Sequence, residues 1–342
     1  MITIVKPGLL TTIQDNGRWG FQANGMPVAG AMDRYAYRAA NILAGNSADT
    51  AVFEMTMLGA TFQFAQDAWV AVCGADMQGT LNGEKITNWS SFFVPAGSEL
   101  AFNFAVQGCR TYLAVKGGLD VPQVLGSQST YTRGRIGGHE GRALRAGDVI
   151  APLHPATGVW NTVRKLPTQW IPQYSSDIAI RVLLGPQENY FTANGIATFL
   201  GNRYTITDEA DRMGYRLEGA KIEHSGKPDI ISDALCQGAI QVPGHGMPII
   251  MMADRQTTGG YAKIGTVIGP DLSLLAQAAP GNTVRFIGCT DEEAVAALRD
   301  EQDKYRQMDA WLAAEPQAGN VKRCYTVKVN GIAYAVQVEE VK

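Results

Sequence analysis

Short alternating strands separated by turn residues are the feature that most constrains the fold of this chain. The pattern occurs in TFQFA (61–65), WVAVCG (69–74), SFFVPAG (91–97), ELAFNFA (99–105) and RTYLAVKGG (110–118). Glycine, proline and asparagine separate these runs, and the 342 residues include 38 glycines, against a usual glycine content of about 7%. Period-two alternation interrupted in this way is typical of antiparallel strands in a barrel or a sandwich. We therefore predict a mainly β fold.

A proline-rich stretch divides the strands into two groups and predicts two domains. Residues 151–175 contain four prolines and show no clean periodicity. A second β-rich block begins after them with DIAIRVLLGPQ (177–187). The chain length also exceeds the usual size of one hydrophobic core. We expect an N-terminal β domain over residues 1–155 and a second β domain over residues 175–289.

Helices are few, and two of them have clear local signals. The segment MDRYAYRAANILAGN predicts a helix with Asp33 as its N-cap and Gly45 at its end. Residues 290–314 predict a helix that closes the second domain, and Thr290 and Glu293 form its capping box. The apolar stripe predicted for this helix comprises Val295, Leu298, Tyr305, Met308 and Leu312.

Two Asn-Gly pairs predict tight hairpins. The first pair lies in LNGEKI (81–86). It predicts a hairpin because Asn-Gly suits the two positive-φ positions of a type I′ turn. The second, Asn330 and Gly331, lies within the tail of the chain, residues 320–342, with alternation on both sides. An isolated hairpin is marginally stable in water, so we expect the tail to pack on the body, to pair with another chain or to remain mobile.

The composition excludes several classes of function. The net charge is −3, which gives no reason to expect nucleic acid or an anionic membrane as a partner. No apolar run reaches the roughly 18 residues of a membrane span, and the N-terminal segment lacks the charged flank and long apolar core of a signal peptide. The five cysteines stand alone, and no histidine lies at metal-ligand spacing. We expect a cytoplasmic protein with reduced, mostly buried thiols and no metal site.

Clustered polar groups interrupt the β pattern first in residues 11–46. Asp15 and Arg18 form a polar turn, and a glycine-rich loop follows it and leads to the helix that begins near Asp33. The N-terminus of a helix behind such a loop can bind an anion through its free N–H groups. An ordinary salt bridge between Asp15 and Arg18 within the turn is the alternative.

Residues 117–148 are the second polar segment and are rich in arginine and glycine. Arg133, Arg135 and Arg142 lie among closely spaced glycines. Arginine favours bidentate binding of carboxylate or phosphate, and glycine allows a ligand to approach the backbone closely. The alternative is a solvated, mobile loop. The spacing fits neither a Walker loop nor a dinucleotide-binding motif.

A run of five polar residues directly after an apolar strand is the third candidate. Adjacent side chains on a strand point to opposite faces, so we do not expect Asp254 and Arg255 to pair with each other. Each should find another partner or meet a ligand, because an unpaired charge is costly to bury. Glutamine and threonine side chains suit a small amide or carboxylate, and a purely structural strand end is the alternative. The predicted substrate-binding residues here are Arg255, Gln256, Thr257, Thr258 and Tyr261, with Gln237 and Gln241 upstream.

Catalytic candidates are few. His139 and His245 lie in glycine-rich loops and are the better acid–base candidates, and a structural role is the alternative for either histidine. Asp254 and Arg255 are further catalytic candidates. The chain has no G-x-S-x-G elbow, and no histidine has a serine or cysteine partner that the sequence makes evident. We therefore expect no nucleophile of the chain's own.

Several long motifs together resemble the KipA family, also called allophanate hydrolase subunit 2-like, biotin-dependent carboxyltransferase-like or the 5-oxoprolinase C subunit. They include GLLTTIQDNGRWGFQANGMPVAGAMD, DRMGYRLEG, GAIQVPGHGMPIIMMADRQTTGGYAKIGTVI and LAQAAPGNTVRF, in the family's order over about residues 3–290. The resemblance implies two cyclophilin-like β-barrel domains. It also implies two partners, a KipI-like protein and a LamB/YcsF-like protein, in an ATP-dependent 5-oxoprolinase that converts 5-oxo-L-proline to L-glutamate. ATP would bind through the complex, because this chain has no recognisable nucleotide motif.

The resemblance also implies two alternative functions. A related module is the carboxyltransferase domain of urea carboxylase, which would make this chain a biotin-dependent carboxyltransferase for urea or another small amide. The tail YTVKVNGIAYAVQVEEV resembles the opening strands of a biotin carrier domain, but it lacks the A-M-K-M motif, so biotin is expected on a separate carrier protein. The other alternative is a non-enzymatic regulator that binds a KipI-like inhibitor of a kinase.

Overall fold

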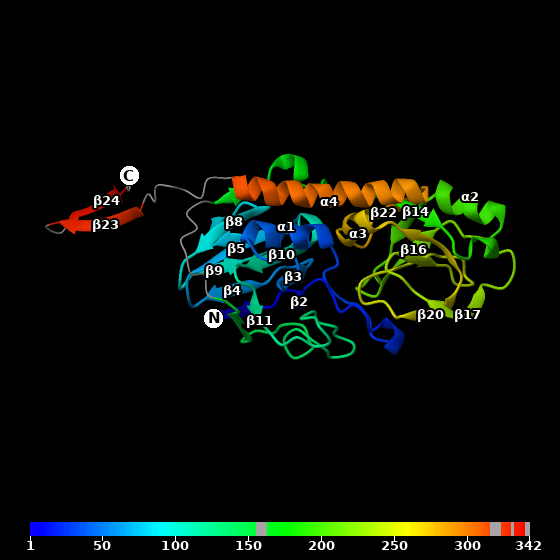
Figure 1. Cartoon of the computed structure of the whole chain (residues 1–342), viewed down its shortest axis with the longest axis horizontal. Coiled ribbons are helices and arrows are strands. Elements are labelled where there is room, and N and C mark those ends of the chain that lie inside the picture. Colours follow the sequence, from blue (N-terminus) through cyan, green and yellow to red (C-terminus); the bar gives the residue numbers. More distant parts are fainter. Residues whose placement is uncertain (155–162, 315–322, 330–331, 339–342) are drawn as a thin grey trace.

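The computed structural model describes residues 1–154, 163–314, 323–329 and 332–338 and has a mainly β fold. Figure 1 shows two β-rich units beside each other, with one long helix, α4 (Asp291–Ala314), lying along both. The other helices are short: α1 (Arg34–Ala44), α2 (Ala193–Gly201), α3 (Gly269–Ala276) and single 3-10 turns at Gln22–Asn24, Thr168–Trp170 and Glu188–Tyr190. The predicted class, mainly β with few helices and a C-terminal helix, is confirmed. Within the described ranges, no helix is both long enough and apolar enough to cross a bilayer.

The first unit consists of two antiparallel sheets packed face to face. Its strands are β1 (Ile2–Lys6), β2 (Leu10–Gln14), β3 (Val52–Thr56), β4 (Thr61–Phe64), β5 (Ala68–Asp76), β6 (Thr80–Leu81), β7 (Glu84–Lys85), β8 (Ser90–Val94), β9 (Glu99–Ala101), β10 (Gln107–Val115), β11 (Leu119–Asp120), β12 (Val149–Pro152) and β13 (Arg164–Lys165). One sheet has the order β11-β12-β1-β4-β9-β6-β7 and the other β13-β8-β5-β10-β3-β2. Ile4 and Phe62 from the first sheet meet Phe53 and Val70 from the second in one buried core. The rings of Phe53 and Phe62 lie 5.0 Å apart.

The second unit is a closed barrel with the strand order β14-β21-β18-β19-β16-β15-β22. Its strands are β14 (Asp177–Leu184), β15 (Arg203–Ile206), β16 (Gly214–Gly219), β18 (Ala239–Gln241), β19 (Ile249–Met251), β21 (Lys263–Val267) and β22 (Thr283–Gly288). The parallel pair of β14 and β22 closes the barrel, and the other pairs are antiparallel. A separate two-stranded flap, β17 (Asp229–Ala234) with β20 (Thr258–Tyr261), carries part of the polar segment after β19.

Local capping and turn signals act as predicted. The Asp33 side chain accepts a hydrogen bond from the backbone N–H of Ala36, and Gly45 ends α1 in the left-handed region at φ 67°. The hairpin between β6 and β7 turns at Asn82 and Gly83, whose φ angles of 52° and 87° are those that a type I′ turn requires. These signals depend on neighbours in sequence, so sequence alone predicts them.

Helix α4 has the predicted capping box but a different buried face. The Thr290 backbone N–H donates to Glu293 at 2.9 Å, and the Glu293 N–H donates to the Thr290 hydroxyl at 3.3 Å. Val295 and Leu298, which were expected in the apolar stripe, are each 44% exposed. The buried residues are Ala294, Ala297, Tyr305 and Met308, because the N-terminal half packs near Ile268 of the barrel and the C-terminal half packs on α1.

A buried network of hydrogen bonds joins the two units. Gln277, just after α3, donates through Nε2 to the carboxylate of Asp33 (2.7 Å) and to the carbonyl of Arg110 (2.9 Å). Its Oε1 accepts from the backbone N–H groups of Cys109 and Arg110. The guanidinium of Arg110 donates to the hydroxyl of Tyr215 in the barrel at 2.7 Å. Because buried polar groups must be paired, these bonds fix how the barrel sits on the first unit.

The tail forms the predicted hairpin, in which β23 (Arg323–Val329) pairs antiparallel with β24 (Ile332–Val338). The predicted turn residues, Asn330 and Gly331, lie outside the described residues, as does part of the predicted linker, 155–162. The four cysteines whose side chains are described are free, and Cys73 and Cys109 are buried as expected. Cys236, in contrast, is exposed, because it lies in the loop between the flap and β18.

Candidate functional site

An open pocket of about 570 Å³ on the outer face of the barrel gathers five of the predicted site residues. Strand alternation explains how the barrel provides its floor. Tyr215 and Ile250 point into the barrel core, so their neighbours on β16 and β19 point outward and line the pocket. The predicted residues that line it are Arg133, Gln241, His245, Gln256 and Tyr261.

Two exposed ion pairs border this pocket. Arg133, from the arginine-rich loop of the first unit, lies 3.4 Å from Asp211 of the second unit. Arg216 on β16 lies 2.9 Å from Glu209. Exposed pairs of this kind are worth about 1 kcal/mol or less, so either arginine can exchange its partner for the carboxylate of a ligand at little cost.

Gln241 and Tyr261 form a connected part of the pocket wall. Gln241 is buried, and its Nε2 donates to the backbone carbonyl of Tyr261 at 3.2 Å. A Cβ at Gly259 would lie 2.5 Å from that same Nε2, so Gly259 is glycine because Gln241 fills the space beside it. A side chain of the chain itself, and not a ligand, therefore occupies the space beside Gly259.

Asp254 lies behind the pocket wall and pairs with Arg212. The guanidinium of Arg212 donates twice to Asp254, at 3.0 and 2.8 Å, and also to Glu54 at 2.5 Å and to the carbonyl of Gly30 at 2.7 Å. Asp254 and Arg212 are buried, as is Glu54 of the first unit. Burial raises the pKa of Asp254, and Arg212 partly opposes this rise. Arg212 follows pocket residue Asp211 in sequence, and so the pair ties one pocket wall to the other and to the first unit.

Arg255 is also buried, and it binds backbone carbonyls rather than a carboxylate. Its Nε donates to Leu235 at 3.2 Å and its Nη1 to Met252 at 3.3 Å. Burial lowers the pKa of Arg255 to about 10, and the charge of Arg34 contributes to the decrease. The prediction that Asp254 and Arg255 would not pair with each other agrees with these contacts. Neither Asp254 nor Arg255 lines the pocket, although Gln256, the next residue along the chain, does.

The remaining residues predicted from the flap segment lie elsewhere. Gln237 accepts a hydrogen bond from Arg34 at 3.1 Å, away from Gln241. The backbone carbonyl of Thr257 accepts from Leu235, and Thr258 pairs with β17 in the flap. Of the residues predicted from this segment, Gln256 and Tyr261 line the pocket, and Thr257 and Thr258 do not.

Asp15 and Arg18 do not form the turn salt bridge considered from the sequence. Asp15 accepts hydrogen bonds from Ser127, Ser129 and the backbone N–H of Gln128. Arg18 is fully buried, and its Nη2 donates to the carbonyl of Ser129 at 2.5 Å. Burial lowers the pKa of Arg18, and Asp15 and Asp254 partly offset the decrease. Both residues therefore anchor the start of the arginine-rich loop.

Arg142 and His139 are held within the arginine-rich loop. Arg142 forms a bidentate ion pair with Asp148, at 2.7 and 2.9 Å, and a further pair with Glu140. The Nε2 of His139 lies 3.4 Å from Asp148. Arg135 is exposed in the left-handed region, at φ 53°. Of the arginines predicted to bind ligand, only Arg133 lines the pocket. Arg142 instead pairs with Asp148 and Glu140 within the arginine-rich loop.

His245 is the histidine that lines the pocket. It is exposed, and its Nδ1 accepts from the backbone N–H of Met247 at 3.1 Å, which leaves Nε2 to carry a proton. No serine, cysteine or lysine lines the pocket among the described residues. The site can therefore orient a polar ligand through hydrogen bonds and charge, and its described lining includes no strong nucleophile.

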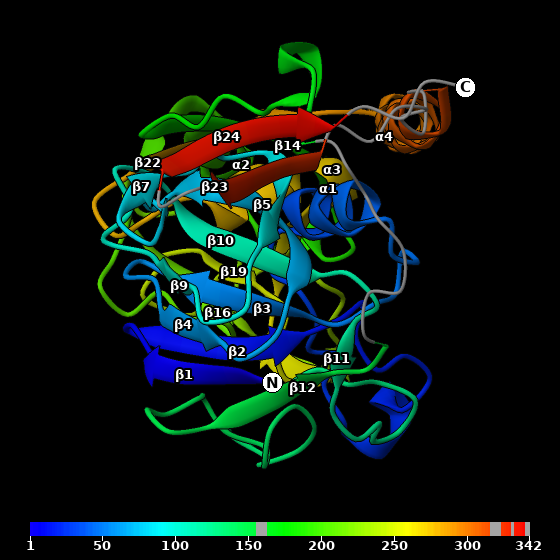
Figure 2. The same ribbon diagram turned by 90° about the vertical axis from the view of Figure 1, so that its left-hand side faces the viewer.

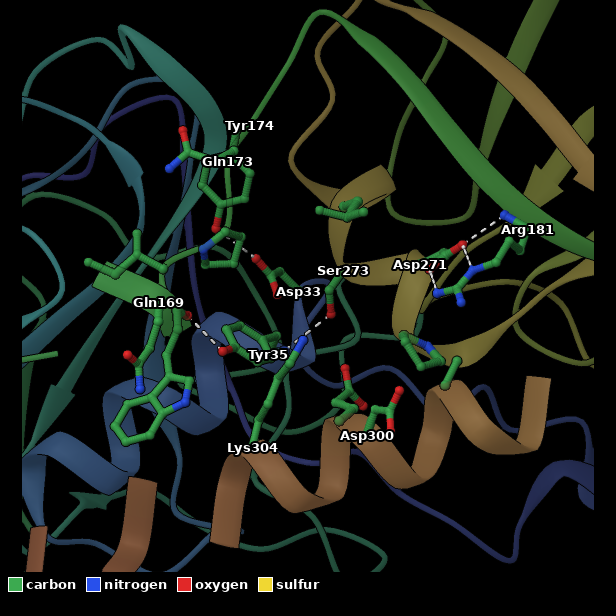
Figure 3. A pocket seen from close by; sticks show the side chains of 17 residues that line it. Asp33, Tyr35, Gln169, Gln173, Tyr174, Arg181, Asp271, Ser273, Asp300 and Lys304 are labelled. Carbon is green, nitrogen blue, oxygen red and sulfur yellow. Dashed lines mark hydrogen bonds and ion pairs between the residues drawn. The ribbon is translucent and has the colours of Figure 1, made fainter. Parts of the chain in front are cut away.

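A second cavity, of about 440 Å³, lies where the segment before β14 meets α3 and α4 (Figure 3). Burial raises the pKa of Asp33 there to about 6, although hydrogen bonds from Ala36 and Gln277 oppose the shift. The hydroxyl of Tyr35 donates to the carbonyl of Trp170 at 2.7 Å. These groups hold the units together, and none of the predicted site residues lines this cavity.

The sequence interpretation missed three residues that shape the candidate site: Glu54, Asp211 and Arg212. A signal was present for two of them, because an Asp-Arg pair also precedes the alternating strand YRLEG, just as Asp254 and Arg255 follow the strand IIMM. The pairing across 42 residues between Arg212 and Asp254 depends on the barrel, and it had no local signal.

Known proteins similar to this chain agree with the fold. The sequence profile of the family described as "Carboxyltransferase domain, subdomain A and B" matches residues 24–288. The chain is 37% identical to the C subunit of 5-oxoprolinase from Escherichia coli (strain K12) over 313 residues, which are 91% of this chain and 98% of that protein.

Urea-metabolising proteins contain a similar segment. The chain is 32% identical to the urea amidolyase of Saccharomyces cerevisiae over 320 residues, covering 88% of this chain but 17% of that protein. The crystal structure of the Kluyveromyces lactis urea carboxylase matches with a TM-score of 0.84 and 28% identity, over 90% of this chain and 29% of the other.

Proposed function

We propose that this chain is the C subunit of an ATP-dependent 5-oxoprolinase. The chain belongs to the family described as the carboxyltransferase domain, subdomains A and B, and within that family it is related to the C subunit of 5-oxoprolinase. In this role it helps to open 5-oxo-L-proline to L-glutamate. The observation that carries the proposal is the 37% identity to the bacterial 5-oxoprolinase component along 98% of that protein, since the urea amidolyase matches over only 17% of its length.

The outer barrel pocket supports the proposal through the types of its polar groups. 5-Oxoproline presents a carboxylate, an amide N–H and an amide carbonyl. Arg133 and Arg216 supply guanidinium groups whose present ion pairs are exposed and exchangeable. Gln241 and Gln256 supply amide groups that can both donate to and accept from the cyclic amide. His245 supplies an imidazole that can form a hydrogen bond with the ligand.

In this proposal the chain needs partners, because the pocket does not contain all the groups that the reaction requires. Opening an amide requires activation of the carbonyl and attack by water, and the described pocket residues include no serine, cysteine or lysine. We assign ATP binding to a cytoplasmic complex with a KipI-like protein and a LamB/YcsF-like protein. Arg133 and Tyr261 line the pocket and are exposed, so a partner can contact them there.

The relation to urea carboxylase supports a second candidate function. The same pocket could hold urea or another small amide while a separate carrier protein presents carboxybiotin. Donors aimed at the amide oxygen would then stabilise the charge that develops during transfer. The TM-score of 0.84 to the urea carboxylase favours this candidate, although identity is lower than to the 5-oxoprolinase component.

Reconstitution separates these candidates. The purified chain is combined with its KipI-like and LamB/YcsF-like partners, 5-oxoproline and ATP, and glutamate is measured. We expect glutamate only from the complete mixture, and a loss of about tenfold or more in kcat/KM with Arg133→Ala or Gln256→Ala. Gln307→Ala, an exposed change on α4, is the matched control.

Two results would contradict the proposal. One is the absence of glutamate from a complete mixture whose proteins form a stable complex. The other is transfer of the carboxyl group from a carboxybiotin carrier protein to urea, which would establish the carboxyltransferase instead. A stable complex with the KipI-like partner and no turnover of either substrate would indicate the regulatory role.

A further inference from the structure

We propose that a pocket between α1, α3 and α4 binds a small oxyanion of the carboxylate or phosphate class. The pocket has a volume of about 290 Å³ and is separate from the outer barrel pocket. Figures 1 and 2 both show these three helices meeting at one place on the molecule. Both units and α4 contribute residues to the lining, so the pocket exists only in the assembled fold.

Two arginines one helical turn apart give the pocket its positive character. Arg34 and Arg38 are at positions i and i+4 of α1 and so lie on the same face of that helix. Neither has a carboxylate within 4.0 Å among the described residues. Arg34 donates to the side-chain oxygen of Gln237 at 3.1 Å, and its guanidinium lies 5.1 Å from the ring centre of Trp19.

Arg38 is held in place by an aromatic ring rather than by an acid. Its guanidinium lies 4.2 Å from the ring centre of Tyr305 on α4, a cation–π contact that leaves the N–H groups free to donate. Its Nε is buried and has no hydrogen-bond partner among the described groups. A buried N–H without a partner is unusual in a folded protein, and an oxyanion in this pocket would supply the acceptor for it.

The hydroxyl of Tyr37 is a second, independent donor without a partner. Tyr37 lines the pocket and is only 2% exposed, and its Oη has no hydrogen bond within the described structure. Burial raises the pKa of Tyr37 well above its ordinary value, with further increases from Asp15 and Asp49, so the phenol stays protonated. A protonated phenol beside two guanidiniums can donate a hydrogen bond to an oxyanion.

Two acidic residues on the rim limit how much charge the ligand can carry. Asp49 and Glu301 also line the pocket, beyond 4.0 Å from either guanidinium. Burial raises the pKa of Glu301, and the charge of Asp33 adds to this rise, while Arg34 and Arg38 oppose it. A compact anion held at the arginines is therefore favoured over a polyphosphate, whose further charges would meet these carboxylates.

Gln237 connects this site to the second unit. It was predicted from sequence to share the substrate pocket with Gln241, but its side chain binds Arg34 and lines the helix pocket. The lining also includes Gly269, the first residue of α3, where the helix dipole adds partial positive charge. An anion at this place would contact groups from α1 and from the barrel at once, and would stabilise their assembly by mass action.

Calorimetric titration of the full chain with inorganic phosphate and, separately, with sodium acetate tests the proposal and distinguishes the two ligand classes. We expect one of these anions to bind and to raise the melting temperature. Arg38→Gln should weaken that binding by about tenfold, and Tyr37→Phe, which keeps the ring and removes only the hydroxyl, by about threefold or more. Arg306→Gln on the exposed side of α4 is the matched control and should bind as the unchanged chain does.

The outcomes are decisive in either direction. Binding of phosphate alone or of acetate alone assigns the class, and loss of binding in Tyr37→Phe places the anion in this pocket. No binding of either anion overturns the proposal, as does equal binding by the unchanged chain, Arg38→Gln and Tyr37→Phe. Gln256→Ala in the outer barrel pocket should not change the affinity, and a loss there would move the anion to the substrate site.

Discussion

Replacement of Arg212 by methionine tests whether one buried cation holds the candidate site and the two units together. The side chain makes four hydrogen bonds, two to Asp254, one to Glu54 and one to the carbonyl of Gly30. Its exposed fraction is 7%, and those of the Asp254 and Glu54 side chains are 5% and 1%. Arg212→Met therefore leaves two buried carboxylates without the cation to which both are hydrogen-bonded.

The expected loss of stability follows from this geometry. Removing one member of a buried ion pair costs about 3–5 kcal/mol, because the remaining charge stays desolvated. Burial lowers the pKa of Arg212, but Asp254 and Glu54 together raise it by more, so the net pKa lies above its ordinary value. The guanidinium is therefore charged in the folded protein. We expect urea unfolding, followed by circular dichroism, to show a loss in that range near neutral pH.

Two further variants make the result interpretable. Arg203→Met removes an exposed ion pair with Asp177, whose side chains are 63% and 43% exposed, and should change stability by about 1 kcal/mol or less. Adding Glu54→Gln and Asp254→Asn to Arg212→Met removes the unpaired charges and should restore part of the loss. If Arg212→Met is no more destabilising than Arg203→Met, the reasoning about the buried network is refuted.

Two smaller predictions concern the pocket wall and the arginine-rich loop. Gly259→Ala should cost about 1–3 kcal/mol and weaken substrate binding, because its Cβ would lie 2.5 Å from Nε2 of Gln241, whereas the nearest atom to a Cβ at Gly260 is 3.7 Å away. Gly260→Ala is therefore the control in the same unfolding and kinetic assays, and equal effects of the two changes would count against this packing. A hydrogen bond from Arg142 lowers the pKa of Asp148 from 3.8 to about 2. The ionised carboxylate therefore stabilises the fold fully above about pH 4, and this stabilisation is lost as the pH falls through about 2. Asp148→Asn should cost about 1 kcal/mol near neutral pH after solvent screening and almost nothing at the acid end, and a cost independent of pH would contradict the assigned cause.

Local signals in the sequence predicted the parts of the fold that depend on neighbouring residues. The cap of α1 at Asp33, the capping box of α4 and the turn at Asn82 each involve groups no more than four residues apart. The buried face of α4 was only partly predictable. Val295 was predicted to be buried because it is apolar, and the sequence of the helix alone does not show which face its neighbours cover. The helix actually rests on both units, and their positions decide which side is covered.

The candidate site was predictable as a segment but not as a set of contacts. Adjacency on a strand correctly implied that Asp254 and Arg255 would find different partners. The partner of Asp254, Arg212, lies 42 residues away, on a neighbouring part of the barrel whose strand order no local pattern gives. Arg142 was interpreted as a ligand-binding residue although Asp148, its partner, lies six residues further along the same segment.

The most direct test of the central claim is the rate of glutamate formation by the chain combined with its KipI-like and LamB/YcsF-like partners in the presence of 5-oxoproline and ATP. The account predicts glutamate from the complete mixture, none from the chain alone, and a loss of about tenfold or more in kcat/KM with Gln256→Ala but not with Gln307→Ala. Glutamate formation that is unchanged by Gln256→Ala and by Arg133→Ala would contradict the assignment of the outer barrel pocket, and no glutamate from an intact complex would contradict the function itself.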